Sequence, residues 1–518
     1  MANNEQFLQE VNIGYTFKGE SIKIGRAMYD GEIVKGADIF LPLRTMNRHG
    51  LIAGATGTGK TKTLQMISEG LSEASIPVLL LDIKGDLSGI AAAGSLNDKI
   101  QERIQKLEID YKPQGTPVEI LTLSEKPGVR LRATVSEFGP VLLSKILGLN
   151  DTQGGVVAMI FKYCDDNKLP ILDIKDFIKV LQYVSNEGKK EIEQTYGKIS
   201  TTSTGTILRK VIELQQQGAD SFFGELSFDV EDLMRISDDG RGMVSILRVT
   251  ELQDRPKLFS TFMLQLLAEL YAVTPEEGDL EKPKLIMFID EAHLIFNDAT
   301  EVLLQQIETV VKLIRSKGIG VFFCTQNPMD IPASVLSQLG LKVQHALRAF
   351  TAADRKVIKQ TAENYPETRF YKTEDLITQM GIGEALITIL NEKGIPTPLV
   401  HCMMAPPRSR MDVLTDGEVA TIVKNSKIAA QYNEVIDNKS AYEILTEKIT
   451  IAQKRSAELE EDEEAAAEEK KKAKQEKTWL DSPMVRSAGR TAATMITRSL
   501  LGVLGIGNTR RRRTRSLF

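Results

Sequence analysis

Short apolar runs alternate with longer amphipathic stretches over most of the chain. Six of these runs have the length of buried strands, and they lie at 49–55, 77–83, 117–123, 242–249, 284–290 and 320–326. Continuous apolar runs are typical of strands that are buried on both faces of a parallel sheet. Because helical stretches separate the runs, the pattern predicts an α/β fold in which helices flank a mostly parallel sheet.

Two further patterns predict separate segments within the first 410 residues. Residues 1–45 alternate around glycines, which predicts a small β-rich N-terminal segment. Residues 131–240 carry apolar residues at helical spacing. They predict a helical insertion between the two parts of the sheet domain, which we place at 46–130 and 241–410.

The C-terminal part of the chain changes character several times. Two apolar runs in 384–404 predict a hairpin that turns around residues 392–394. Residues 411–455 predict a helical extension of one or two helices. Residues 456–478 form an acidic block followed by a basic block without apolar heptads, which predicts a solvated single helix or a disordered linker. Residues 479–518 form a basic tail.

Composition excludes several classes of protein. Hydrophobic residues make up 42% and charged residues 26% of the chain, values that exclude a disordered or collagen-like protein. Basic residues number 65 and acidic residues 70, so any binding of nucleic acid must come from local patches. The three scattered cysteines form no CxxC pair, which argues against a disulfide framework or zinc finger and fits a reducing compartment. No signal peptide or apolar run of about 20 residues is present, so we expect a cytoplasmic protein.

A glycine-rich motif follows the first apolar run and precedes a helical stretch. It matches G-x-x-x-x-G-K-[ST], the pattern of a phosphate-binding loop. The predicted nucleotide-binding residues are Gly54, Ala55, Thr56, Gly57, Thr58, Gly59, Lys60, Thr61 and Lys62. Glycines let backbone N–H groups turn toward a phosphate, and the helix N-terminus adds partial positive charge. We expect Lys60 to reach the β- and γ-phosphates and the Thr61 hydroxyl to bind Mg²⁺, whereas the alternative is a chance glycine-rich turn.

Two acids end a later apolar run. Asp290 and Glu291 follow KLIMFI, and two adjacent acids at the end of a buried strand would be costly without a cation. We predict that Asp290 binds Mg²⁺ and that Glu291 is the general base toward an attacking water. The alternative is an edge strand that continues into a polar loop.

A third run ends in polar residues and supplies further candidates. Gln326 ends the run at 320–326 and would lie beside the two acids if the sheet is parallel, where it could sense the γ-phosphate or orient the water. An arginine near the developing phosphate charge can raise the rate by orders of magnitude. Arg315 is our first candidate for a finger that reaches a neighbouring subunit's nucleotide, with Arg348 and Arg355 as further candidates. Asp82 and Lys84 lie at the end of the run at 77–83. They either point to the edge of the sheet that carries the predicted site, or they form an ordinary turn after a strand.

The end of the chain is strongly basic. Five arginines fall within six positions, and they are Arg510, Arg511, Arg512, Arg513 and Arg515. This tail could bind nucleic-acid phosphates, contact an anionic membrane surface, or serve as a solubilising end. Few aromatic residues accompany the arginines, so base stacking is not favoured.

These motifs, in this order, resemble those of the HerA–FtsK superfamily of P-loop ATPases. The chain is most similar to the bacterial HerA-like helicase group (DUF853, YjgR-type). The resemblance rests on HGLIAGATGTGKTKTLQ (49–65), LLDIKGDLSG (80–89), LLSKILGLNDTQGG (142–155), FIDEAHLIF (288–296), CTQNP (324–328) and KGIPTPLVHCMMAPPRSRM (393–411). It extends over nearly the whole chain to about residue 411.

The resemblance implies a RecA-like sheet, hydrolysis of ATP with Mg²⁺ and often a hexameric ring. HerA and FtsK relatives use such a ring to pump double-stranded DNA. Only 53 residues precede the phosphate loop, fewer than the N-terminal β-barrel of HerA itself needs, so partners that engage the barrel are not implied. The helical insertion is not required by motor chemistry and is a candidate site for a partner protein.

Two other functions remain open on sequence alone. The chain could be an ATPase that remodels a protein or a membrane-associated partner, or a nucleotide-dependent scaffold. A GTPase is disfavoured because no NKxD motif for guanine is present. A small-molecule kinase is disfavoured because the Asp290-Glu291 pair suits activation of water.

Overall fold

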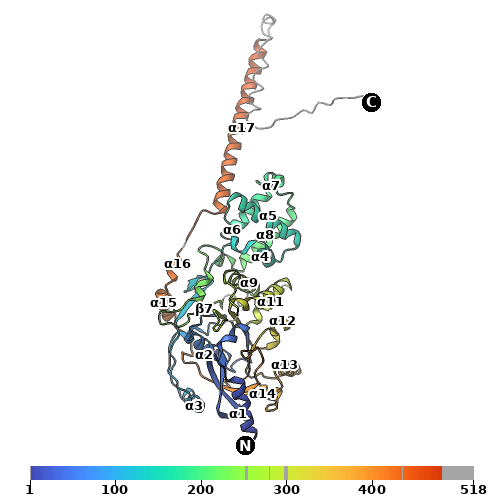
Figure 1. Ribbon diagram of the computed structural model, residues 1–518. Helices are drawn as coiled ribbons and strands as arrows, with labels where there is room; N and C mark the ends of the chain where they lie inside the picture. Colours follow the sequence, from blue (N-terminus) through green and yellow to red (C-terminus); the bar gives the residue numbers. More distant parts are fainter. Residues whose placement is uncertain (1, 251–254, 279, 297–300, 435, 481–518) are drawn as a thin grey trace, which may run out of the picture. The chain divides into compact units, whose positions relative to one another are not determined.

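A computed structural model of the chain describes residues 2–250, 255–278, 280–296, 301–434 and 436–480. The chain divides into two compact units, Met1–Leu445 and Thr446–Phe518. Figure 1 shows the elements in chain order. The α-helices are α1 (Ala2–Tyr15), α2 (Lys60–Glu73), α3 (Asp98–Leu107), α4 (Val135–Ile146), α5 (Asp151–Asn167), α6 (Ile174–Ser185), α7 (Lys189–Thr195), α8 (Thr201–Gln216), α9 (Pro256–Val273), α10 (His293–Phe296), α11 (Glu301–Ile314), α12 (Ala333–Leu336), α13 (Ala352–Glu363), α14 (Thr373–Gln379), α15 (Asp416–Asn425), α16 (Ala429–Asn433) and α17 (Ala441–Leu480).

A mixed sheet forms the centre of the first unit. Within the described residues it has twelve strands, in the order β2-β1-β12-β11-β10-β3-β9-β8-β4-β7-β5-β6. The strands are β1 (Ser21–Tyr29), β2 (Glu32–Pro42), β3 (Gly50–Ala53), β4 (Val78–Asp82), β5 (Val118–Thr122), β6 (Val129–Arg130), β7 (Val244–Arg248), β8 (Leu285–Ile289), β9 (Ile319–Thr325), β10 (Leu341–Gln344), β11 (Glu384–Thr388) and β12 (Val400–Met404). Neighbours from β10 to β6 pair in parallel, and those from β2 to β10 pair antiparallel.

The six apolar runs are strands of this sheet, so the predicted α/β fold is confirmed. They form β3, β4, β5, β7, β8 and β9, each within one or two residues of its run. Every residue of β4, β8 and β9 is buried. Side chains alternate between the two faces of a strand, so continuous burial means that both faces of the sheet are covered.

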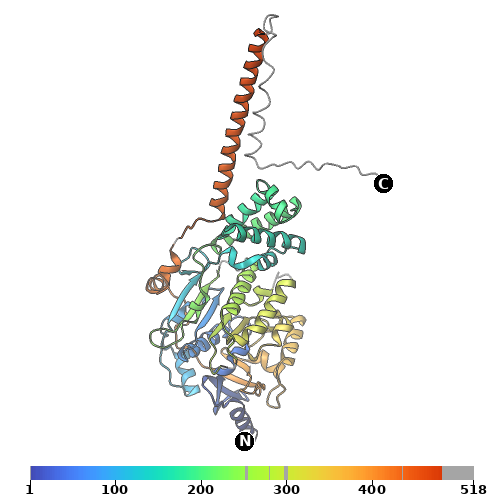
Figure 2. The ribbon, with the colours of Figure 1, turned by 45° about the horizontal axis from the view of Figure 1, so that its top comes forward.

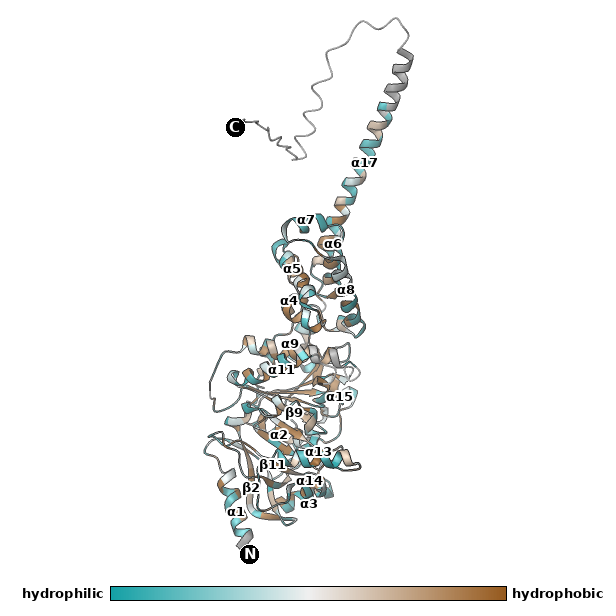
Figure 3. Ribbon diagram, turned by 90° about the vertical axis from the view of Figure 1, so that its right-hand side faces the viewer, coloured by the Kyte–Doolittle hydropathy of each residue, from teal (hydrophilic) through white to brown (hydrophobic). Residues whose placement is uncertain are grey.

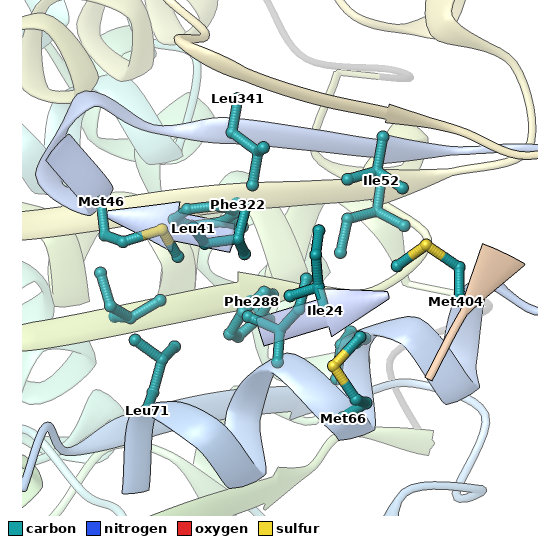
Figure 4. Packing of buried hydrophobic residues seen from close by; sticks show 14 of the residues in the cluster. Ile24, Leu41, Met46, Ile52, Met66, Leu71, Phe288, Phe322, Leu341 and Met404 are labelled. Atoms are coloured by element: carbon teal, nitrogen blue, oxygen red, sulfur yellow. The ribbon is translucent and has the colours of Figure 1, made fainter. Parts of the chain in front are cut away.

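The core lies on both sides of the central strands. Phe288 and Phe322 on neighbouring strands pack 5.0 Å apart between ring centroids, on the face that α2 covers with Leu71. Figure 4 shows this packing, with Ile52 and Met66 in the same cluster. The close packing of α2 against these strands holds the loop before it in one position.

The N-terminal segment differs in part from its prediction. Residues 21–42 form β1 and β2 as expected, but α1 precedes them. Its buried residues Phe7, Val11 and Tyr15 are spaced by four and lie on one helix face, a pattern hidden by the polar residues between them. The Tyr15 hydroxyl donates to the carbonyls of Ile387 and Pro398, at 2.9 and 2.8 Å. β1 pairs with β12, so this segment extends the main sheet.

The predicted helical insertion contains α4 to α8, which group together in Figure 2. Polar caps set where its helices begin. The Asn150 and Asp173 side chains accept the backbone N–H groups of Gln153 and Asp176, which satisfies donors that the first turn leaves free. The insertion packs through α4 against α9. The hairpin predicted in 384–404 is β11 and β12, which pair antiparallel.

The C-terminal extension, residues 411–455, contains helices. It consists of α15, α16 and the start of α17, and α17 continues through the charged residues 456–478. The charged linker is therefore a single helix, and Figure 3 shows it largely hydrophilic. The basic tail, including Arg510–Arg515, lies outside the described residues from 481 onward. In the part of the chain that the structure describes, no helix has the length and hydrophobicity needed to cross a bilayer.

Candidate active site

The predicted phosphate loop connects β3 to α2. Gly54 has φ 154° and Gly59 has φ 115°, both in the region that glycine adopts readily. A Cβ at Gly54 would lie 2.5 Å from the Cβ of His345, and one at Gly59 would lie 3.2 Å from the backbone N of Gly383. Glycine is therefore required at both positions for conformation and for space. The loop leads into the N-terminus of α2, where free N–H groups and the helix dipole favour an anion.

Lys60 lies across this loop. Its Nζ donates to the carbonyls of Gly54 and Ala55, at 2.7 and 3.2 Å, and the side chain is buried. Burial lowers the pKa of the Lys60 ammonium, and the nearby Lys84 lowers it further. An ammonium whose partners among the described residues are loop carbonyls can exchange them for phosphate oxygens. Thr61 follows in the first turn of α2 and is half-buried.

The side chain of Lys62 leaves the loop. Its Nζ donates to the carbonyl of Met411 at 2.5 Å and to Oε1 of Gln65 at 3.3 Å. The backbone N–H of Lys62 lies in the first turn of α2, among the donors that lack an intrahelical partner. Its backbone N–H is therefore the group of Lys62 that faces the loop, and its contact with a nucleotide stays a prediction.

The two acids lie at the same edge of the sheet as the loop. β8, β9 and β3 are parallel neighbours, so their C-terminal ends meet at one edge. Asp290 is 7% exposed, and its Oδ2 has no hydrogen-bond partner among the described residues. Burial and then the charge of Glu291 raise the pKa of Asp290 to about 7. A buried carboxylate oxygen without a partner, beside a second acid, is suited to a cation.

Glu291 is the centre of a polar cluster. It is 5% exposed and adopts φ 46°, a conformation that is uncommon outside glycine. Its carboxylate forms an ion pair with Lys84, and its Oε2 lies 3.2 Å from Nδ1 of His293. Gln326 Nε2 donates to Glu291 Oε1 at 3.5 Å, while Gln326 Oε1 accepts from Thr56 Oγ1 at 3.3 Å. Gln326 thus connects the phosphate loop to the acid.

Asp82 and Lys84 have different surroundings. Asp82 is fully buried, and its carboxylate accepts the backbone N–H groups of residues 85–87 at 2.7 to 3.2 Å. Burial raises the pKa of Asp82 to about 6. Asp82 therefore shapes its own turn, as the alternative interpretation held. That turn directs Lys84 to Glu291. Burial acts to lower the pKa of Lys84, but the ion pair with Glu291 outweighs it and raises that pKa.

The candidate arginines lie at different edges of the sheet. Arg315 precedes β9 and therefore lies at the edge opposite the phosphate loop. Arg348 follows β10, which is parallel to β3, and so lies on the loop's side. Its guanidinium donates to the carbonyls of Thr378 and Met380, at 2.8 and 3.3 Å. Arg315 could reach a nucleotide only on another subunit, so its predicted role as a finger requires assembly.

Sequence analysis missed several residues that build the site. His345 lies between Thr63 and the carbonyl of Glu384, with its ring nitrogens 3.0 Å and 2.8 Å from them. Burial lowers the pKa of His345 to about 4, so the ring is neutral and joins α2 to β11. Gln65 and Glu69 on α2 are also buried and polar. Their signal was present, because polar residues interrupt the otherwise apolar face of that helix.

Comparison with known proteins identifies the family of this chain. The profile of the family described as Helicase HerA-like C-terminal matches residues 29–512. The chain belongs to this family.

Curated relatives carry names consistent with the family. The DNA double-strand break repair helicase HerA of Sulfolobus acidocaldarius is 21% identical, over 74% of this chain and 69% of its own length. The protein of the same name from Saccharolobus solfataricus is 22% identical, over 68% of this chain and 64% of its own length. The chain thus spans about two thirds of each relative. Our narrower assignment to the DUF853 group stays a prediction.

Solved structures show the same fold. The plasmid coupling protein TrwB in complex with ADP and Mg²⁺ superposes with a TM-score of 0.50 at 12% identity, over 76% of this chain and 97% of TrwB. At that identity the likeness concerns the fold, a RecA-like P-loop sheet. Together with the family, it makes this chain a P-loop ATPase.

Proposed function

We propose that this protein is a Mg²⁺-dependent ATP-hydrolysing motor of the HerA–FtsK type that moves along DNA. The observation that supports it most is the convergence of Lys60, Glu291 and Gln326 at one edge of the sheet, from three separate loops. These are the groups that positioning of phosphates and activation of water require. The names of the curated relatives support DNA as the substrate.

The residues present fit a magnesium ion. Thr61 offers a hydroxyl and Asp290 a carboxylate oxygen without a partner among the described residues, and hard oxygen ligands suit Mg²⁺. When bound, Mg²⁺ would neutralise charge on the phosphates. A cation beside Asp290 would also favour its ionised form.

Residues of the chain bind the phosphates and activate the attacking water. Lys60 holds phosphate oxygens in place of the loop carbonyls. Glu291 accepts a proton from the attacking water, and Gln326 orients that water because its amide already touches the Glu291 carboxylate. The ion pair with Lys84 defines the direction of the Glu291 carboxylate. Loop glycines and the first turn of α2 supply N–H groups to the phosphates.

Double-stranded DNA is expected to stimulate ATP hydrolysis by the full-length chain. Contacts with phosphates release counterions, so the stimulation should fall as salt rises from about 50 to 200 mM. The measurement is ATPase rate against DNA concentration at several salt concentrations, with single-stranded DNA in parallel. A rate unchanged by either nucleic acid at low salt would contradict the DNA motor and favour an ATPase that acts on a protein partner.

We also propose self-association into a ring, because the Arg315 finger must come from a neighbouring subunit. Arg315→Ala and Lys60→Ala subunits should each be inactive alone and recover turnover when mixed. In the mixture, a subunit with an intact phosphate loop can receive an intact arginine from its Lys60→Ala neighbour. The measurement is ATPase rate against mixing ratio, with Arg348→Ala carried through the same series.

Two results would contradict the Arg315 assignment. Wild-type turnover in Arg315→Ala would remove it from the reaction, and a mixture without recovery would show that it does not act between subunits. Recovery with Arg348→Ala alone would transfer the role to that residue. Oligomer mass with and without ATP tests the ring itself.

Further proposals concern the parts of the chain outside the active site and its location in the cell. We propose the insertion, α4 to α8, as a site for a partner protein because the sheet edge that carries the chemistry does not include it. We also keep the prediction of a cytoplasmic location. The tail remains proposed to bind DNA phosphates or a membrane surface.

A further inference from the structure

Two lysines approach Glu291 from opposite sides. Within the described sheet, β9 and β8 lie between β3, which leads into the phosphate loop, and β4, which leads to Lys84. Glu291 follows β8, so it lies between Lys60 of the loop and Lys84. Burial lowers the pKa of Lys60 and the charge of Lys84 lowers it further, because the two ammonium groups are near each other. A γ-phosphate that extends beyond Lys60 would therefore meet a second lysine.

The turn after β4 fixes the backbone of Lys84 but leaves its side chain room to move. The carboxylate of Asp82 accepts the backbone N–H of Gly85 at 2.7 Å, and Gly85 has φ 80°, a conformation that suits glycine. The side chain of Lys84 is 37% exposed, whereas that of Glu291 is 6% exposed. The acid is therefore held in place, and the lysine is the partner that can change its position.

Lys84 occupies the place that the attacking water needs. Its ammonium pairs with Oε1 of Glu291, the same oxygen that accepts Nε2 of Gln326 at 3.5 Å. A water that Gln326 orients toward Glu291 must reach this oxygen. The other oxygen, Oε2, is buried without a hydrogen-bond partner among the described residues, with Nδ1 of His293 3.2 Å away. As long as the ion pair with Lys84 persists, Oε1 is blocked to that water.

A γ-phosphate offers Lys84 a better partner than Glu291 does. A terminal phosphate presents three charged oxygens, whereas Lys84 uses one oxygen of the carboxylate. Lys84 can therefore exchange Glu291 for the phosphate, just as Lys60 can exchange the loop carbonyls. ADP has no γ-phosphate, so it gives Lys84 no reason to leave the acid.

We propose that Lys84 moves from Glu291 to the γ-phosphate when ATP binds, and that this exchange opens Glu291 to the attacking water. The proposal rests on the proposed function, because it takes the phosphates to lie in the loop and Glu291 to be the base. Lys84 then distinguishes ATP from ADP, and it makes the base available only when a γ-phosphate is present.

The first test measures binding and turnover separately on the full-length chain. The probes are ADP and the β,γ-imido analogue of ATP, which is not hydrolysed, each with Mg²⁺ and measured by calorimetry. Lys84→Met removes the charge and Lys84→Arg keeps it. Lys126→Met is the matched control, because Lys126 is exposed, follows a parallel strand at the same edge, and donates to Thr250 at 3.1 Å. Thermal melting verifies folding.

We expect Lys84→Met to bind the ATP analogue about tenfold or more weakly, the scale of one hydrogen bond to a charged group. Its affinity for ADP should stay that of wild type, and its ATP turnover should fall by about tenfold or more. Lys84→Arg should retain the preference for the analogue over ADP and part of the turnover. The control should match wild type in every measurement.

The second test examines the exchange itself with a double-mutant cycle. Glu291→Gln should bind the ATP analogue more tightly than wild type does, because binding no longer has to break the ion pair with Lys84. This gain should be absent for ADP, and it should disappear in the double variant Lys84→Met, Glu291→Gln. A gain of the same size in the double variant would come from the lost charge of Glu291 alone and would overturn the exchange.

Other results would also overturn the proposal. Equal losses of ADP and of the analogue in Lys84→Met would show a general effect on the site. Reduced turnover with unchanged affinity for the analogue would mean that Lys84 only orients Glu291, and faster turnover would mean that it only restrains it. If wild type binds neither ADP nor the analogue, the proposed function itself fails, and the role of Lys84 fails with it.

Discussion

Replacement of Glu291 by glutamine is expected to abolish ATP turnover while leaving ATP bound. Glutamine keeps the shape of the side chain but cannot accept the proton of the attacking water, and loss of a general base lowers rates by about 10²–10⁴-fold. The substitution also removes the ion pair with Lys84. The amide of Gln326 then faces a neutral side chain instead of a carboxylate. The measurement is steady-state ATPase rate together with the affinity for ATP.

The matched control for this variant is Glu276→Gln, which makes the same change at an exposed residue outside the site. It should keep wild-type turnover. Normal turnover in Glu291→Gln would exclude Glu291 as the base. Loss of ATP binding in a folded Glu291→Gln protein would show that Glu291 maintains the structure of the site and is not the base.

Lys60→Ala is expected to remove nucleotide binding and, with it, turnover. A hydrogen bond to a charged group contributes about 1.5–3 kcal/mol, so each bond from Lys60 to a phosphate is worth about tenfold to a hundredfold in affinity. The Lys60→Ala protein should stay folded without nucleotide, since the partners of Lys60 among the described residues are loop carbonyls and its burial disfavours the charge. The measurement is the rise of Tm on addition of ATP and Mg²⁺, which the variant should lose.

Lys359→Ala, an exposed lysine of α13, serves as the control and should keep the full rise of Tm. A Lys60→Ala protein that melts like wild type without nucleotide and still responds to ATP would contradict the role of Lys60. A variant already unfolded without nucleotide would instead show that the lysine is needed to hold the loop.

Much of the sheet could be predicted because its central strands are buried on both faces. Burial on both faces leaves continuous apolar runs, as in β4 and β8, and such runs are visible without any neighbour. The antiparallel half of the sheet was harder. β10 was not predicted because Lys342 and Gln344 interrupt its apolar residues, and α1 was missed because only Phe7, Val11 and Tyr15 mark its buried face.

Some residues of the site could likewise be predicted from the sequence, and others could not. Lys60, Asp290, Glu291 and Gln326 were predictable because each belongs to a short motif at a strand end, and parallel strands bring such ends together. His345 belongs to no such motif. Its contacts with Thr63 and with the carbonyl of Glu384 exist only because α2 packs beside β11.

The sequence by itself determined the local chemistry of this protein. A glycine-rich loop, two adjacent acids and a polar strand end can each be identified from consecutive residues, because backbone conformation and residue type suffice to define them. The tertiary structure alone decided which distant groups share a space. Lys84 meets Glu291, and α3 meets residues 404–411, only because the order of strands places their loops at one edge. Such contacts depend on packing between segments hundreds of residues apart, and nothing in either segment encodes its partner.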